Sequence, residues 1–384
     1  MIVIVTGNAA TNGAITSNDW SSPMTIQNVR ADHYSIPLPV VLSDSMHGDM
    51  ASFELMTVRI TDADGNEGLG YTYALGGGAR AVHSVLVNDM LPTLIGRDAD
   101  RIEDIWKHLW WKLHWTGRGG VVMFALSALD IALWDLLGKR TRLPLWRLLG
   151  GANPKVKAYA GGIDLMFTID ELLAQTDANL EKGFRAIKMK VGRETLREDI
   201  ERIAAMRAHL GADFPLMVDA NMRWSVDEAI RAAQSFQQFS LVWMEEPTIP
   251  EDFAGHARIL AHGGVPISSG ENLRTLYDFQ HMLAANGVSY IEPDVAICGG
   301  ITVWMKVARL AEARNLPVTS HGVHDLHVHL LGAIPNASYL EVHGFGLERF
   351  IAEPLTIVDG YATAGERPGH GISFDWHALE GHRV

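Results

Sequence analysis

The stretch Ala186-Ile187-Lys188-Met189-Lys190 is a short run of β-forming residues that ends in a charged side chain. An amphipathic, helix-like segment follows it, and the same unit recurs from Gly151 onward. Eight such β-rich runs occur, at residues 156–160, 186–190, 216–219, 241–245, 265–269, 290–293, 318–321 and 338–341. Strands that alternate with helices at this cadence indicate an α/β protein in which residues 151–351 form a parallel β/α-barrel.

The residues before the barrel carry a different pattern. Residues 1–23 are rich in Asn, Ser, Thr and Gly and are predicted to be a flexible leader. Polar and apolar residues alternate from Phe53 to Ile60, as in a strand, whereas residues 79–149 show helical spacing. Residues 24–150 are therefore expected to form a separate α+β domain. The tail at 352–384 breaks the barrel cadence, and we expect it to return to this domain.

The composition is that of a folded protein without a nucleic-acid or membrane partner. Of the 384 residues, 47% are hydrophobic and 20% are charged, far from the signature of disorder. The formal net charge is -13 and the basic residues are scattered, so there is no electrostatic footprint for a phosphate backbone or an anionic membrane. No stretch approaches the roughly 20 apolar residues of a membrane span. The one cysteine, Cys298, excludes an intramolecular disulfide and agrees with a cytoplasmic location.

The residues that close the barrel runs are nearly all ionisable. In β/α-barrels the functional site lies at the carboxyl ends of the strands. The residues there are Lys188, Lys190, Asp219, Glu245, Glu271, Asp294, His321 and Glu341. Asp219, Glu245 and Glu271 follow one another at intervals of 26 residues, one β/α unit each, so their carboxylates should converge.

Three converging carboxylates require a cation between them. Oxygen-only ligation by Asp219, Glu245 and Glu271 suits one Mg²⁺ per subunit, whereas zinc would favour His or Cys. An acid can also simply cap a strand-to-helix loop, but three of them in successive units argue against that interpretation.

Two pairs of residues are candidates for proton transfer. Lys188 and Lys190 lie at i and i+2 on one strand, so both should point into the barrel, although a solvated strand end is the alternative. Two ammonium groups near each other and near a metal should lose basicity, which would make a lysine usable as a general base. Asp294 and His321 close neighbouring strands, and the aspartate should orient the imidazole and raise its pKa. A lone histidine is more often structural, and His321 is chosen for its place at a strand end.

Taken together, the motifs resemble the enolase superfamily and, within it, the mandelate racemase subgroup. The matching segments are Lys188-Met189-Lys190, Val218-Asp219-Ala220-Asn221, Trp243-Met244-Glu245-Glu246-Pro247, Ser269-Gly270-Glu271-Asn272, Pro293-Asp294 with Gly299-Gly300, Ser320-His321 and Leu340-Glu341. Each motif alone is weak, but the ordered set covers nearly the whole chain after the leader and is highly specific. It includes Ala128-Leu129-Asp130-Ile131-Ala132-Leu133-Trp134-Asp135 in the first domain.

The resemblance implies a (β/α)₇β TIM-like barrel under an α+β N-terminal capping domain, with Mg²⁺ on the three acids. It implies that Lys190 is the base on one face of the substrate and that His321, with Asp294 behind it, acts on the other. Lys188 would lie against the substrate carboxylate, and Glu341 would donate a hydrogen bond to the enolate oxygen. An ionised carboxylate cannot donate, so the pKa of Glu341 should be raised.

Proton abstraction next to a carboxylate leads either to racemisation or to loss of a β-hydroxyl. The segment 42–49, expected to set specificity, is polar, and Arg223-Trp224 resembles the pattern of acid-sugar dehydratases. Ser45, His47, Asn221 and Arg223 are therefore the candidate substrate-binding residues. The favoured reaction is dehydration of an aldarate or aldonate to a 2-keto-3-deoxy acid by a lyase, with a racemase of 2-hydroxy acids as the alternative.

Two other classes of protein remain open. His327-Val328-His329 suggests a zinc hydrolase of the amidohydrolase type, although that fold places such a pair after its first strand. A catalytically silent binding protein on the same fold is the other. In every case the expected partner is a small-molecule carboxylate, and apolar surface on the first domain would make a homo-oligomer ordinary.

Overall fold

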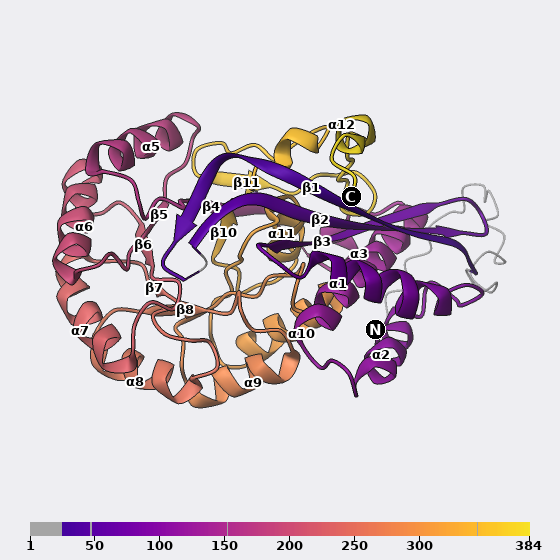
Figure 1. The fold of residues 1–384 in the computed structure, drawn as a ribbon, viewed down its shortest axis with the longest axis horizontal. Coiled ribbons are helices and arrows are strands. Elements are labelled where there is room, and N and C mark those ends of the chain that lie inside the picture. The colour runs from indigo at the N-terminus through magenta and orange to yellow at the C-terminus, as the bar shows by residue number, and fades with distance from the viewer. Residues whose placement is uncertain (1–24, 47, 152, 344) are drawn as a thin grey trace, which may run out of the picture.

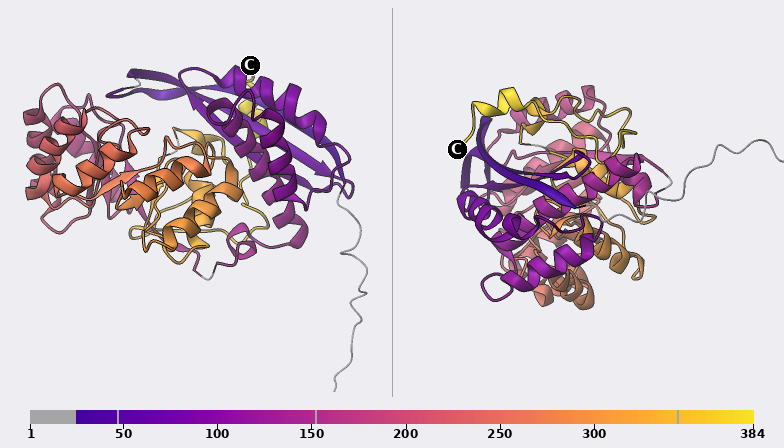
Figure 2. Two further views of the ribbon diagram at one scale, coloured as in Figure 1. Left: turned by 90° about the horizontal axis from the view of Figure 1, so that it is seen from below. Right: turned by 90° about the vertical axis from the view of Figure 1, so that its right-hand side faces the viewer.

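Three long antiparallel strands form the sheet of the N-terminal domain. The computed structural model describes residues 25–46, 48–151, 153–343 and 345–384, so the leader predicted at 1–23 lies outside the described residues. The strands are β1 (Ile26–Asp44), β2 (Gly48–Asp62) and β3 (Glu67–Leu75), in the order β1-β2-β3. β1 and β2 reach across the barrel (Figures 1 and 2), where the Ser45 hydroxyl donates to the Ala220 carbonyl at 2.7 Å.

Helices cover one side of this sheet. They are α1 (Ala79–Ser84), the π-helix η1 (Val85–Met90), the 3-10 helix η2 (Leu91–Thr93), α2 (Ile102–Leu113), α3 (Gly120–Thr141) and α4 (Leu145–Leu148). α3 packs directly on β3, because Gly70 has no side chain: a Cβ there would lie 2.0 Å from the Ala128 carbonyl oxygen. By length and composition α3 could cross a membrane, but 72% of its most apolar window is buried inside the protein, as in a core helix.

Seven parallel strands form most of the barrel. They are β4 (Lys155–Gly161), β5 (Ile187–Lys190), β6 (Leu216–Asp219), β7 (Met244–Glu245), β8 (Ile267–Ser269), β9 (Tyr290–Ile291) and β10 (Tyr339–Val342). Their order is β10-β4-β5-β6-β7-β8-β9. The predicted run 318–321 is not a strand, but Val318 forms parallel bridges with Ile291 and Ala337 and so closes the ring. The predicted barrel is confirmed.

The barrel helices form an outer ring, as Figure 1 shows. They are α5 (Ile169–Glu181), α6 (Leu196–Leu210), α7 (Val226–Phe236) with η3 (Gln237–Phe239), α8 (Phe253–Gly263), α9 (Leu276–Ala285), α10 (Gly300–Glu312) and α11 (His324–Gly332). Several begin with a capping box, in which a Ser or Thr and an acid three residues later satisfy the first backbone N–H groups. The Ser225 backbone N–H, for example, donates to the Glu228 carboxylate at 3.0 Å.

The C-terminal tail contacts both domains. After η4 (Leu347–Phe350), strand β11 (Tyr361–Thr363) pairs antiparallel with β4 of the barrel. Beyond it, α12 (Trp376–Glu380) leads to Arg383, which pairs with Asp32 of β1. The last amide, of Val384, donates to the His33 carbonyl at 3.0 Å.

A buried aspartate joins the two domains. Asp130 of α3 accepts a hydrogen bond from the Thr302 hydroxyl at 2.6 Å and another from the Thr302 amide at 2.9 Å, at the start of α10. Burial raises the pKa of Asp130 to about 7, although both Thr302 bonds favour the charged form. The folded protein therefore binds the Asp130 proton more tightly than the unfolded chain does, and the stability linked to it is lost as pH rises toward 7.

We predict that Asp130→Asn removes this pH dependence. Between pH 5 and pH 8 the free energy of unfolding of the wild type should fall relative to the variant by roughly 3 kcal/mol, because Asp130 must ionise in a buried site. Urea unfolding at both pH values measures the difference. Glu312→Gln, at an exposed carboxylate of α10 that is paired with Arg309, is the control and should leave the pH dependence unchanged. Parallel curves for the wild type and Asp130→Asn would contradict the prediction.

Candidate functional site

A cavity of about 190 Å³ opens at the carboxyl ends of the barrel strands. Its floor comes from the barrel and its roof from the N-terminal domain, which contributes Asp44, Met50, Tyr73 and Leu75. Six of the predicted site residues line it: Lys188, Lys190, Asn221, Glu271, His321 and Glu341. The opposite end of the barrel interior is filled by Tyr159, Ala186, Met217 and Trp243, so the cavity is a closed-bottomed pocket.

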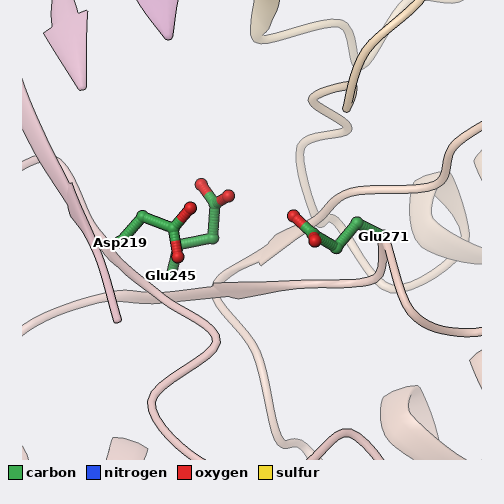
Figure 3. A group of neighbouring side chains, drawn as sticks. All are labelled: Asp219, Glu245 and Glu271. Atoms are coloured by element: carbon green, nitrogen blue, oxygen red, sulfur yellow. The ribbon is translucent and has the colours of Figure 1, made fainter. Parts of the chain in front are cut away.

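Three carboxylates converge beside this cavity, as the residue spacing predicted: Glu271 lines it, and Asp219 and Glu245 contact the lysines that line it. Asp219 ends β6, Glu245 ends β7 and Glu271 follows β8, and each offers an oxygen within 4.8 Å of the others. Figure 3 shows Asp219 and Glu245 side by side with Glu271 facing them across a shared space. All three side chains are buried, and an all-oxygen donor set of this kind suits a hard divalent cation.

The two lysines lie among these acids. The Lys188 amine is 2.5 Å from Glu245 Oε1 and 2.8 Å from Glu341 Oε1, and the Lys190 amine is 2.5 Å from Asp219 Oδ2. The predicted loss of basicity beside a bound metal stays a prediction. Burial would lower the pKa of both lysines, but the acids around them outweigh burial and raise both pKa values. The acids that hold the two amines therefore favour the ammonium form, whereas the prediction concerned lysines that share their site with a metal.

Glu341 is also ionised, contrary to the expectation of a raised pKa. Burial alone would raise the pKa of this carboxyl, but the positive charges of Lys188 and His321 lower it below its ordinary value. Its Oε2 atom accepts the Gly322 backbone N–H at 2.9 Å, which further favours the charged form. Glu341 therefore accepts a hydrogen bond from Lys188, and its lowered pKa disfavours the predicted role as a donor.

An aspartate holds the imidazole of His321, and this predicted pair is present. His321 Nδ1 lies 2.9 Å from Asp294 Oδ2, and His321 Nε2 lies 3.5 Å from Glu271 Oε2. Burial would lower the His321 pKa, but Glu271 and Asp294 raise it to about 10, so the ring carries a proton on both nitrogens at neutral pH. Tyr73 also contacts this pair, but no motif pointed to it, because it lies on a strand of the capping domain far from the barrel motifs.

The predicted substrate-binding residues do not all reach the cavity. Asn221 does, and its buried side-chain oxygen has no hydrogen-bond partner in the described structure. Ser45 instead fastens the cap to the barrel backbone at Ala220 and Asn221. Arg223 points into a separate groove beside Trp224 and donates to the Gly192 carbonyl at 3.2 Å. His47 lies outside the described residues.

Comparison with known proteins identifies the family. The N-terminal domain model of mandelate racemase and muconate lactonizing enzyme matches residues 26–150, and the enolase C-terminal domain-like model matches residues 171–378. The chain belongs to the mandelate racemase/muconate lactonizing enzyme family of the enolase superfamily. This agrees with the resemblance seen in its motifs and with the observed barrel and cap.

Relatives within this family act on sugar acids. The chain is 54% identical to the 3,6-anhydro-α-L-galactonate cycloisomerase of Streptomyces coelicolor, over 92% of this chain and 98% of the relative. It is 34% identical to the L-talarate/galactarate dehydratase of Salmonella typhimurium, over 88% and 86% respectively.

Solved structures from the same family agree with these relatives. A racemase from Streptomyces coelicolor A3(2) with bound magnesium superposes with a TM-score of 0.92 at 53% identity, over 94% of this chain and all of that one. An L-talarate dehydratase from Polaromonas sp. JS666, in complex with Mg and L-glucarate, has a TM-score of 0.89 at 34% identity, over 94% and 97%.

The cavity walls are more apolar than we predicted from the polar segment 42–49. Asp44 is the one side chain of that segment's described residues in the lining. The apolar residues of the lining come from elsewhere in both domains: Met50, Leu75, Phe124, Ile163, Ile297 and Phe345. Asn272 and Arg274, after β8, add polar groups that the sequence pattern did not single out. The lining therefore combines apolar and polar surface.

The histidine pair that suggested a zinc hydrolase is structural. His327 Nε2 accepts the Val295 backbone N–H at 3.0 Å, and its Nδ1 donates to the Gly322 carbonyl at 2.8 Å. Both ring nitrogens are therefore occupied. His329 is buried, which lowers its pKa to about 3, and neither ring lines the cavity.

We predict that the carboxylate cluster binds one Mg²⁺ per chain and that Glu271→Gln weakens this binding by about 10-fold or more, because a charged ligand becomes neutral. Titration calorimetry of the metal-free protein measures the affinity. Asp130→Asn is the control: Asp130 is a buried carboxylate of the capping domain that accepts from the Thr302 hydroxyl and lies outside the cluster. Equal loss in both variants, or a preference for Zn²⁺, would contradict the prediction.

Proposed function

We propose that the protein is a Mg²⁺-dependent enzyme that removes the proton next to the carboxylate of a sugar acid and then expels the oxygen on the adjacent carbon. The observation that carries this proposal is the placement of two proton-transfer groups at opposite ends of the carboxylate cluster. The Lys190 amine contacts Asp219 at one end, and His321 lies beside Glu271 at the other. A substrate bound over the cluster would have an amine on one side and an imidazole on the other.

The residues present fit the metal that this chemistry needs. Asp219, Glu245 and Glu271 would hold it, since they supply carboxylate oxygens only and are buried together. Mg²⁺ bound there would supply positive charge for the second negative charge that develops on the substrate carboxylate. Lys188, fully buried between Glu245 and Glu341, adds a fixed ammonium group for the same carboxylate.

Lys190 is the proposed base. Its ammonium is held by Asp219, so it can accept a proton only after that attraction weakens. Positive charge in the cluster would compete for the Asp219 carboxylate and lower the Lys190 pKa, which makes the amine available. The neutral amine then takes the proton from C2, and the electron pair of the C–H bond moves toward the substrate carboxylate.

His321 is the proposed acid. Its ring is protonated at neutral pH, and Asp294 occupies Nδ1, so Nε2 is the nitrogen that can give its proton to the substrate. As the C2=C3 double bond forms, the C3–O bond breaks and the leaving oxygen takes this proton. The resulting enol becomes a 2-keto-3-deoxy acid by tautomerisation. The leaving oxygen departs as water or, where it bridges two carbons of the substrate, stays on the other carbon as a hydroxyl when the ring opens.

We favour a leaving oxygen that stays attached, as in the opening of a 3,6-anhydro sugar acid. The relative that is 54% identical carries out a cycloisomerisation, and the apolar cavity wall suits the C–H face of such a ring. Dehydration of an aldarate or aldonate is the second candidate, supported by the 34% identical dehydratase and by the polar Asn221, Asn272 and Arg274 in the lining. The first candidate classifies the enzyme as an isomerase, the second as a lyase.

A substrate panel in D₂O distinguishes these reactions. The panel contains a 3,6-anhydroaldonate, several aldarates and aldonates, and a simple 2-hydroxy acid, each with Mg²⁺. We predict a keto acid of unchanged composition from the anhydro acid, faster than keto acid formation with loss of water from the open-chain acids. Mass spectrometry and NMR measure both. Loss of optical rotation by the 2-hydroxy acid, with no keto product from any sugar acid, would instead indicate a racemase.

We also predict that Lys190→Ala and His321→Asn fail at different steps. Lys190→Ala should abolish both keto acid formation and the entry of solvent deuterium at C2. His321→Asn should lower kcat by roughly 100-fold to 10,000-fold while deuterium still exchanges into recovered substrate, because the base remains. NMR of recovered substrate makes the comparison. Undiminished exchange in Lys190→Ala would show that the assignment of the base is wrong.

A further inference from the structure

Tyr73 is a cap residue that reaches the proposed acid. It lies on β3, paired with Leu55 of β2, and its ring stacks on Phe53 with centroids 5.2 Å apart. Its hydroxyl donates to Asp294 Oδ2 at 2.5 Å and lies 3.2 Å from His321 Nδ1. The phenol is fully buried and stays protonated, since burial and the nearby Asp294 charge raise its pKa well above the ordinary value.

A single oxygen of Asp294, Oδ2, contacts both Tyr73 and His321. Asp294 Oδ1 is occupied by the Ala296 backbone N–H at 2.8 Å, which leaves Oδ2 for Tyr73 and His321 together. With the Tyr73 hydroxyl in place, Asp294 is held from the cap side and the barrel side. The position of the His321 ring then depends on a carboxylate whose two oxygens are both hydrogen-bonded.

The neighbouring residue of β3 strengthens this attachment. The Thr72 hydroxyl donates to the Ala296 carbonyl at 2.6 Å. The successive side chains Thr72 and Tyr73 of β3 therefore both form hydrogen bonds to the turn at 294–296. The barrel backbone leaves room for the contact at Gly322, where a Cβ would lie 3.0 Å from the Tyr73 hydroxyl. These are buried contacts across the domain boundary, and their partners are more than 200 residues apart in the chain.

We propose that Tyr73 is a positioning residue through which the capping domain completes the Asp294–His321 pair. Its hydroxyl fixes Asp294, and Asp294 in turn aims His321 Nε2 into the cavity. His321 is thus held in position for proton transfer only when β3 is docked on the turn at 294–296. The consequence for catalysis rests on the proposed function, whereas the effect on the histidine ring does not.

The test is Tyr73→Phe in the full-length, Mg²⁺-loaded protein, which keeps the ring and removes the hydroxyl. We expect kcat for keto acid formation to fall roughly 10-fold to 100-fold with little change in KM, as for loss of a hydrogen bond to a charged group. Deuterium exchange by Lys190 should persist, so the ratio of exchange to product should rise. A purely structural defect would lower exchange and product formation together and would overturn the proposal.

Two controls make the outcome specific. Tyr71→Phe removes a hydroxyl from the same strand, at a ring that packs edge-on against Phe374, and should leave kcat unchanged. In an Asp294→Asn background, Tyr73→Phe should have almost no additional effect, because the two residues act as one unit. Additive losses in the double variant would overturn the proposal.

An NMR measurement separates this inference from the proposed function. The ring-proton signal of His321, assigned by its absence in His321→Asn, should shift in Tyr73→Phe and stay in place in Tyr71→Phe, with no substrate present. If the signal shifts but no sugar acid is turned over, the positioning contact stands and the proposed function fails. If the signal is unmoved by Tyr73→Phe, the positioning role is refuted whatever the activity.

Discussion

Asp219, Glu245 and Glu271 are buried within 4.8 Å of one another, and like charges placed so closely repel strongly. Two unit charges about 4 Å apart repel by roughly 4 kcal/mol in a partly screened protein environment. The folded chain must therefore bring positive charge to the carboxyl ends of β6, β7 and β8. Lys188 and Lys190 on β5 provide part of it, and a bound divalent cation would provide the rest.

This requirement explains how the two domains are joined. Charge stabilisation is strongest where water is excluded, and the barrel alone leaves its carboxyl end open. The capping domain covers that end with β1 and β2, and separate buried hydrogen bonds hold it against the barrel. Asp130 holds the start of α10, and Tyr73 holds Asp294. Because Tyr73 contacts Asp294, the docking of the capping domain over the cavity also positions His321, the proposed acid.

Much of the barrel and of the site could be predicted from sequence because both depend on local periodicity. Strands that end in charged residues at equal intervals must place those residues at one face, and Asp219, Glu245 and Glu271 do converge. The lowered pKa of Glu341 could not be predicted, since it depends on the sum of all neighbouring charges at short distances. Tyr73 could not be found either, because its contact with Asp294 joins residues 221 positions apart through the docking of two domains.

The most direct test of the charge arrangement is a crystal structure of the protein with Mg²⁺ and an unreactive sugar-acid analogue. The account predicts one cation bound by Asp219, Glu245 and Glu271, the analogue between Lys190 and His321, and the Lys190 amine displaced from Asp219 toward C2. A cation bound elsewhere, or an analogue that fails to lie between the amine and the imidazole, would contradict it.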